Sequence, residues 1–153
     1  MISEGDRAPD MDVTTSAGEA INLARPGKPM VLYFYTKDDT SGCTREAQDF
    51  SALAEEFEKA GTWILGVSKD SPAAHQKFTD KYDLKVRLAS DVDGSVCESF
   101  GTWVQKSMYG RKYMGIDRAT FLVNRDGTIA RIWRKVKVPG HAEEVLRAAR
   151  ELP

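Results

Sequence analysis

The sequence predicts an α/β protein with a mixed central sheet and helices on both faces of that sheet. Short apolar runs typical of buried strands alternate with longer segments whose apolar residues recur every three or four positions. A hairpin signal and a last helical segment follow them. The 153 residues are enough for one core, so we expect a single domain over residues 1–153.

The first half of the chain should contain strands and helices in alternation. Short strands are expected at 11–14 and 21–23, and an apolar core strand at 30–35. Apolar spacing predicts a helix over 42–60, which Gly61 ends. A parallel strand at 62–67 and a helix from Pro72 to Tyr82 come next.

The second half is expected to close the sheet. A short strand at 86–89 precedes a short helix that carries Cys97. The turn residues 124–127 separate strands at 119–123 and 128–133, and a final helix spans 140–151. This element order is the order of thioredoxin-like folds.

Charge and composition exclude several classes of function. The net charge is -1, so no overall field favours nucleic acid or an anionic membrane, and we expect neither as a partner. No apolar run approaches membrane-spanning length, and the N-terminal residues do not resemble a signal peptide. With only two cysteines there is no disulfide framework, and we expect a cytoplasmic protein.

Cys43 is the residue that points most directly to chemistry. It follows the apolar strand at 30–35 and begins a helical segment, which places it where a strand's carboxyl end meets a helix's amino end. The partial positive charge of a helix amino end stabilises a thiolate, the reactive form of cysteine. The sequence therefore predicts a thiol enzyme.

Two further residues are candidates for the same site. Arg118 precedes a strand and could supply the positive charge that lowers the pKa of Cys43, although it could equally be a surface arginine paired with Asp117. The Thr40 hydroxyl could cap the helix or bond to a substrate oxygen beside the sulfur.

The remaining cysteine and the two histidines suggest less. Cys97 in its short helix is either a buried small hydrophobe or the residue that resolves an oxidised Cys43. Glu46 occupies the position that a C-x-x-C motif would require for a second cysteine. His75 and His141 lack a short ligand spacing to any cysteine, so we expect both to face solvent, with no metal and no cofactor.

The run from Tyr33 to Ala47, YFYTKDDTSGCTREA, resembles the active-site region of peroxiredoxins of the peroxiredoxin Q, or bacterioferritin-comigratory protein, subgroup. Residues 5–10, 114–122 and 136–141 continue the resemblance along nearly the whole chain. It implies a thioredoxin-fold peroxidase that reduces hydrogen peroxide and organic hydroperoxides, in antioxidant defence and redox homeostasis.

The resemblance also implies roles for individual residues. Cys43 would be the peroxidatic cysteine and form a sulfenic acid. Thr40 and Arg118 would complete the pocket and stabilise charge on the departing oxygen. Glu46 matches a supporting position that can orient the arginine.

Three positions depart from the family pattern. Thr36 stands where the motif usually has proline, and its presence is expected to loosen the pocket. Ser41 follows Thr40 where proline is common in the subgroup. Gln48 stands where many members carry the resolving cysteine, so the usual disulfide within the helix cannot form.

Two routes for reducing the oxidised enzyme therefore stay open. Either Cys97 resolves Cys43 after a local rearrangement, or an external thiol reduces Cys43 directly, and we favour the second route. Thioredoxin, glutaredoxin or glutathione would then be the reductant, and we expect a monomer. The alternative function is a redox-regulated holdase or peroxide sensor that relays oxidation to a partner protein.

Overall fold

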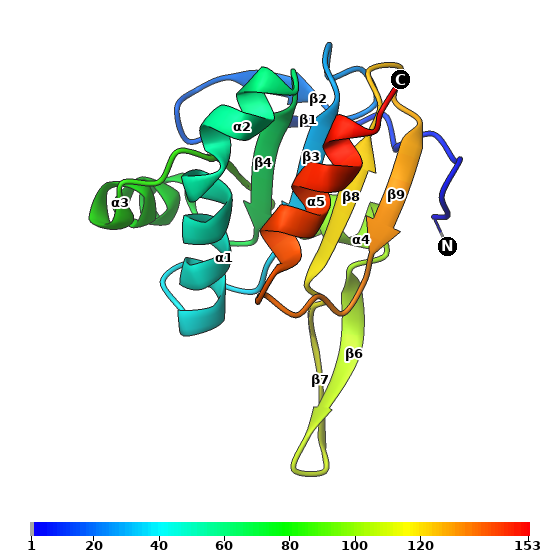
Figure 1. Cartoon of the computed structure of the whole chain (residues 1–153). Coiled ribbons are helices and arrows are strands. Elements are labelled where there is room, and N and C mark those ends of the chain that lie inside the picture. The colour runs from blue at the N-terminus through cyan, green and yellow to red at the C-terminus, as the bar shows by residue number, and fades with distance from the viewer. Residues whose placement is uncertain (1) are drawn as a thin grey trace.

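The computed structural model describes residues 2–153 and is built around a five-stranded mixed sheet (Figure 1). The sheet has the order β5-β4-β3-β8-β9. Its strands are Met30–Phe34 (β3), Trp63–Ser68 (β4), Arg87–Ser90 (β5), Ala119–Val123 (β8) and Ile129–Trp133 (β9). β3 is central because it pairs parallel with β4 on one side and antiparallel with β8 on the other.

The other elements surround this sheet. The helices are Ser41–Ala52 (α1), Ala54–Lys59 (α2), Pro72–Tyr82 (α3), Ser95–Ser99 (α4) and His141–Arg150 (α5). Two antiparallel hairpins join Asp12–Thr14 (β1) to Ala20–Asn22 (β2) and Trp103–Met108 (β6) to Arg111–Ile116 (β7). None of the helices within residues 2–153 combines the length and apolar character needed to span a bilayer.

The sheet separates two cores. Side chains of successive strand residues point to opposite faces, so Val31 and Tyr33 lie on one face, and Leu32 and Phe34 on the other. The first face is covered by α1, α2 and α5 (Figure 1). The second face is covered by α4 and the β1–β2 hairpin. This confirms the predicted mixed sheet with helices on both faces.

The helix expected over 42–60 is two helices. Leu53 leaves helical geometry, with φ -102° and ψ 7°, and its N–H donates to the carbonyl of Phe50. The change of direction brings Phe57 of α2 against Phe50 of α1, with ring centroids 5.9 Å apart. The free energy gained by burying both rings against the sheet therefore exceeds the cost of interrupting the helix.

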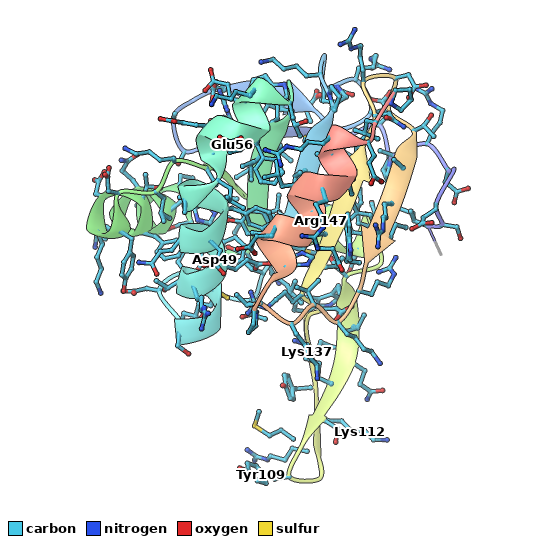
Figure 2. All side chains as sticks on the ribbon, viewed as in Figure 1. Asp49, Glu56, Tyr109, Lys112, Lys137 and Arg147 are labelled. Carbon is cyan, nitrogen blue, oxygen red and sulfur yellow. The ribbon has the colours of Figure 1, made fainter. Side chains whose placement is uncertain are left out.

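The β6–β7 hairpin was not predicted from the sequence. Its turn residues Tyr109 and Gly110 both have positive φ, at 51° and 77°, which is the geometry of a tight two-residue hairpin turn. The hairpin projects from the rest of the molecule, with Tyr109 at its tip (Figures 1 and 2). Most of its side chains are exposed, so the alternation of buried and exposed residues that marks a strand is weak.

Both histidines are buried, and the prediction that they face solvent is wrong. His75 is 0% exposed and His141 is 6% exposed. His141 Nε2 lies 2.8 Å from the Thr120 hydroxyl, and its ring packs edge-on against Trp133 and Phe50. A helical position that looks polar in the sequence is thus part of the core between α5 and the sheet.

Acidification should destabilise the fold through His141. Burial, with a contribution from the charge of Arg118, lowers the pKa of His141 from 6.5 to about 4. The unfolded chain therefore binds the extra proton between those values, and stability is lost as the pH falls through this window. We expect wild type to lose about 2 kcal/mol more unfolding free energy than His141→Gln between these pH values, measured by urea denaturation. Equal losses in the two proteins would show that protonation of His141 does not cause the loss of stability.

Candidate active site

Cys43 lies where the central strand gives way to the first helix. It is the third residue of α1, and its side chain belongs to the core on the α1 face. The residue is only 1% exposed. Backbone N–H groups of the first helical turn have no partner within the helix, so a thiolate there experiences their partial positive charge.

Arg118 bridges the sulfur and a buried carboxyl group. Its Nη2 donates to Cys43 Sγ at 3.2 Å and its Nη1 to Glu46 Oε1 at 2.7 Å. Arg118 comes from the connection between β7 and β8, so residues far apart in sequence meet at the end of the sheet. Gly42 leaves room for this guanidinium, because a Cβ there would lie 3.3 Å from Arg118 Nη2. The structure does not pair Arg118 with Asp117.

Glu46 lies one helical turn after Cys43, on the same buried side of α1. Its side chain is 2% exposed, and Oε2 has no hydrogen-bond partner. Burial raises the pKa of Glu46 to about 7, against the opposing effect of Arg118. Glu46 therefore depends on Arg118 for the stability of its charged form, and it holds the guanidinium in place in return.

The Thr40 side chain does not cap α1. Thr40 occupies the N-cap position, but its hydroxyl donates to the carbonyl oxygen of Lys37 at 2.8 Å. This bond lies inside the loop that connects β3 to α1. Of the two roles considered for Thr40, helix capping is therefore absent from this structure.

Thr36 is a site residue that was not predicted from the sequence. Its Oγ1 lies 3.2 Å from Cys43 Sγ. From the sequence, Thr36 was expected only to loosen the pocket, whereas the structure places its hydroxyl within hydrogen-bond distance of the sulfur. The signal in the sequence was a side chain able to form hydrogen bonds, seven residues before the cysteine.

The groups around Cys43 together favour its thiolate. Burial alone would raise the pKa of Cys43. The backbone N–H of Lys37 and the hydroxyl of Thr36 oppose burial through hydrogen bonds. The charge of Arg118 adds to them, and the pKa of Cys43 lies below its ordinary value. A buried cysteine with a lowered pKa, at the end of a central strand, is suited to nucleophilic attack.

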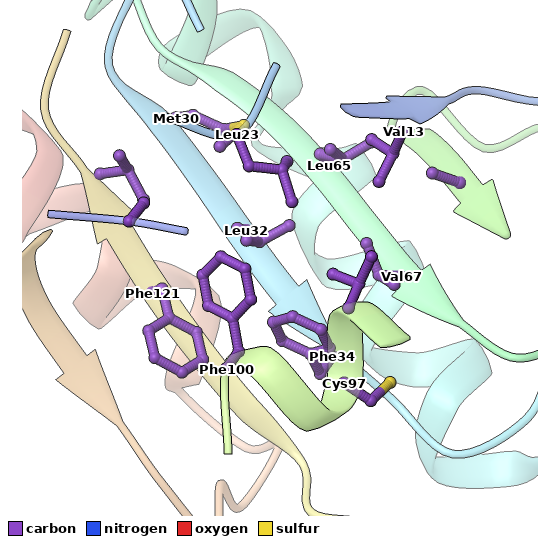
Figure 3. Close-up of a cluster of buried hydrophobic side chains, with 14 of the residues drawn as sticks. Val13, Leu23, Met30, Leu32, Phe34, Leu65, Val67, Cys97, Phe100 and Phe121 are labelled. Carbon is purple, nitrogen blue, oxygen red and sulfur yellow. The ribbon is translucent and has the colours of Figure 1, made fainter. Parts of the chain in front are cut away.

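Cys97 lies in the other core. It packs with Phe34 and Phe100 on the α4 face of the sheet (Figure 3). Burial, together with Asp91, raises the pKa of Cys97 to about 12. The two cysteines are both free thiols, and the sheet lies between them.

A buried hydrogen-bond network holds the loop that carries Thr36 and Thr40. His75 Nδ1 lies 2.7 Å from Asp38 Oδ2, and His75 Nε2 lies 3.0 Å from the carbonyl oxygen of Ala89. The other oxygen of Asp38 accepts the hydroxyl of Tyr35 at 2.5 Å. The loop is thereby tied to α3 and β5 by a network that was not predicted from the sequence.

Two residues of this network, together with Asp70, form a cluster whose side chains are of the types that bind metal ions. The ligand atoms of Asp38, Asp70 and His75 lie within 4.8 Å of one another. However, Asp70 Oδ2 accepts the Ser68 hydroxyl and the Asp38 backbone N–H. Since the protein already supplies hydrogen-bond partners for these groups, the cluster is explained as part of the loop anchor.

Removing the histidine of this network should cost stability. His75→Leu would remove the ring nitrogens beside the Asp38 carboxylate and the Ala89 carbonyl, and it would leave Tyr35 as the remaining side-chain donor to Asp38. We expect the unfolding free energy to fall by about 3 kcal/mol, measured by chemical denaturation. The exposed neighbour Gln76 provides the control, and Gln76→Ala should change stability by less than about 0.5 kcal/mol. Equal effects of the two substitutions would contradict an anchoring role.

Comparison with known proteins identifies the family. The family model described as AhpC/TSA matches residues 4–132. The peroxiredoxin Bcp of Xanthomonas campestris is 46% identical over 140 residues, which are 91% of this chain and 88% of that protein. The peroxiredoxin Bcp of Bacillus subtilis is 41% identical over 152 residues, which are 99% of this chain and 97% of that protein.

Solved structures agree with this family. A structure of the Xanthomonas campestris bacterioferritin comigratory protein, from work on its alkyl peroxide reduction activity, matches with a TM-score of 0.86. It is 45% identical, over 92% of this chain and 90% of that chain. A PrxQ mutant of Xylella fastidiosa matches with a TM-score of 0.90 at 36% identity, over 97% of this chain and 95% of that chain. The chain therefore belongs to the AhpC/TSA family, in its peroxiredoxin Q subgroup, and is a thiol-dependent peroxidase with a thioredoxin-like fold.

Proposed function

We propose that Cys43 is the peroxidatic residue and that it reduces hydrogen peroxide and alkyl hydroperoxides through a sulfenic acid. The observation that carries this proposal is the Arg118 guanidinium, which contacts both the Cys43 sulfur and Glu46. A cation fixed beside the sulfur favours the thiolate before reaction and faces the oxygens of a peroxide during it. The alkyl peroxide activity of the Xanthomonas campestris relative supports the wider substrate range.

The reaction follows from the chemistry of a thiolate. The Cys43 sulfur attacks one peroxide oxygen, the O–O bond breaks, and the other oxygen leaves as water or an alcohol after taking a proton. Arg118 stabilises the negative charge on the leaving oxygen, and Thr40 does so once its hydroxyl turns from the Lys37 carbonyl toward the peroxide. The sulfur is left as a sulfenic acid, two electrons more oxidised than the thiol.

An external thiol then restores the enzyme. The first thiol condenses with the sulfenic acid to a mixed disulfide and water, and a second thiol releases Cys43. The position of Cys97 supports this one-cysteine cycle, since it is buried in the opposite core and its pKa is raised to about 12. A thiol with so high a pKa provides little thiolate at neutral pH. Thioredoxin, glutaredoxin and glutathione are the reductants that we propose to compare.

The setting of the enzyme forms part of the same proposal. Two free thiols, of which one must be regenerated by another thiol, suit a reducing compartment, and we assign the protein to the cytoplasm. We also propose that it acts as a monomer in antioxidant defence, because the site assembles from one copy of the chain. The comparisons give no support to the holdase or sensor alternative.

Intact mass after oxidation tests the function and the route together. One equivalent of hydrogen peroxide, added to reduced protein without other thiols, should add one oxygen, which a sulfenic-acid trap captures on Cys43. Cys97→Ser should behave like wild type, and Cys43→Ser should stay unmodified. A loss of two hydrogens at monomer mass would instead establish a Cys43–Cys97 disulfide. Peroxide left unconsumed by wild type would overturn the proposed function.

The reaction should depend on the shape of the Arg118 guanidinium as well as on its charge. Arg118→Lys keeps the charge, but a single ammonium cannot hold Glu46 and the sulfur in the same geometry. We expect kcat/KM for hydrogen peroxide to fall by about 10- to 100-fold, measured with excess reductant. Arg111→Lys, on the exposed hairpin, is the matched control and should retain wild-type activity. Unchanged activity in Arg118→Lys would show that the bidentate contact is dispensable.

A further inference from the structure

The Cys43 sulfur has a hydroxyl neighbour that the family pattern does not supply. Thr36 Oγ1 lies 3.2 Å from Cys43 Sγ, the same distance that separates Arg118 Nη2 from the sulfur. At this position the motif of the family usually has proline, whose side chain has no hydroxyl. Thr36 therefore gives this chain a polar contact to its reactive atom that is absent from that pattern.

The direction of this hydrogen bond follows from the ionisation of the sulfur. A thiolate has no proton and only accepts hydrogen bonds, whereas a threonine hydroxyl can donate one. When Cys43 is ionised, Thr36 must therefore be the donor. Hydrogen bonds to a charged partner are stronger than those between neutral groups, so the contact stabilises the thiolate more than the thiol.

Thr40 does not supply the same proton in this structure. Its hydroxyl donates to the carbonyl oxygen of Lys37, and a carbonyl oxygen can only accept. A hydroxyl has one proton, so Thr40 cannot donate to the sulfur while that bond is made. Thr36 is then the threonine whose hydroxyl proton is available to Cys43.

The loop also holds Thr36 in position. Tyr35, which precedes it, is buried and donates to Asp38, which follows it. Asp38 is fixed in turn by His75 and by its own backbone bond to Asp70. A hydroxyl on a fixed backbone loses less freedom when it bonds to the sulfur than one on a mobile loop.

We propose that Thr36 is a catalytic residue of this peroxidase, whose hydroxyl donates a hydrogen bond to the Cys43 thiolate and enlarges the reactive fraction of Cys43 at neutral pH. The inference rests on the proposed role of Cys43 as the peroxidatic residue. Its chemistry is balanced without a further reactant, because Thr36 neither gains nor loses a proton. The exposed position of Thr36 places this donor between the buried sulfur and the solvent from which peroxide arrives.

Thr36→Val is the test, because valine has the shape of threonine without the hydroxyl. The thiolate of Cys43 is titrated by its ultraviolet absorbance, and the rate of peroxide reduction is measured over the same pH range. We expect the titration to move to higher pH and the rate at a pH below the wild-type titration midpoint to fall by about three- to tenfold. At a pH above the titration the two rates should converge, because both proteins are then fully ionised. Thr36→Ser retains the hydroxyl and should behave like wild type.

The groups that face the sulfur are the same in all three proteins. They are Arg118 from the β7–β8 connection, with Glu46 of α1 bonded to it, and Tyr33 from β3, whose pKa is raised by burial and in part by the charge of Cys43. Cys97 titrates separately because its pKa is raised to about 12. A difference between Thr36→Val and Thr36→Ser therefore reports on the hydroxyl.

Two results would overturn the proposal. One is a Thr36→Val thiol that titrates at the same pH as wild type. The other is a rate that falls by the same factor at every pH, which would mean a displaced loop and not a lost hydrogen bond. Failure of the proposed function is distinguishable from both, since it would appear as a wild-type protein that consumes no peroxide.

Discussion

The contact of Arg118 with Cys43 and Glu46 is the interaction on which the site depends. Two acidic groups are buried side by side on α1, and each would be costly to ionise alone. A single guanidinium compensates both, because its planar donors reach the sulfur at 3.2 Å and the carboxylate at 2.7 Å. The same contact holds the segment before β8 against α1. Arg118 therefore stabilises both the charges of the site and the packing of the elements that form it.

The sheet is what brings these groups together. β3 is central and delivers the loop before α1 at its carboxyl end, while the antiparallel partner β8 begins at that same end. Phe34, the last residue of β3, is paired with Ala119, so Arg118 stands beside the loop. The position of Arg118 therefore follows from strand register. A shift by one residue would turn its neighbours to the other face of the sheet.

The local pattern of the sequence was enough to locate Cys43. Contacts between residues far apart in the sequence could not be predicted in the same way. The apolar run before Cys43 and the helical spacing after it fix its place in a strand and a helix without knowledge of the rest of the chain. The Asp38–His75 contact joins residues 37 positions apart, and the bond from His75 to Ala89 comes from another strand. Such partners have no periodicity, and His75 consequently looks like a solvent-facing helical residue. Thr36 was judged by the proline that it replaces, and only the fold shows that its hydroxyl reaches the sulfur.

The two cysteines have opposite environments, and the reason lies in what surrounds each sulfur. Donors converge on Cys43: a guanidinium, a threonine hydroxyl and the amino end of α1. At Cys97 the carboxylate of Asp91 accepts the backbone N–H groups of Val96 and Cys97, and its effect on the thiol exceeds the opposing effect of Lys69. Asp91 satisfies the first turn of α4 and in doing so places negative charge beside the thiol, which disfavours a thiolate there. The features that stabilise α4 therefore disfavour the reactive, ionised form of Cys97, whereas the groups around Cys43 favour it.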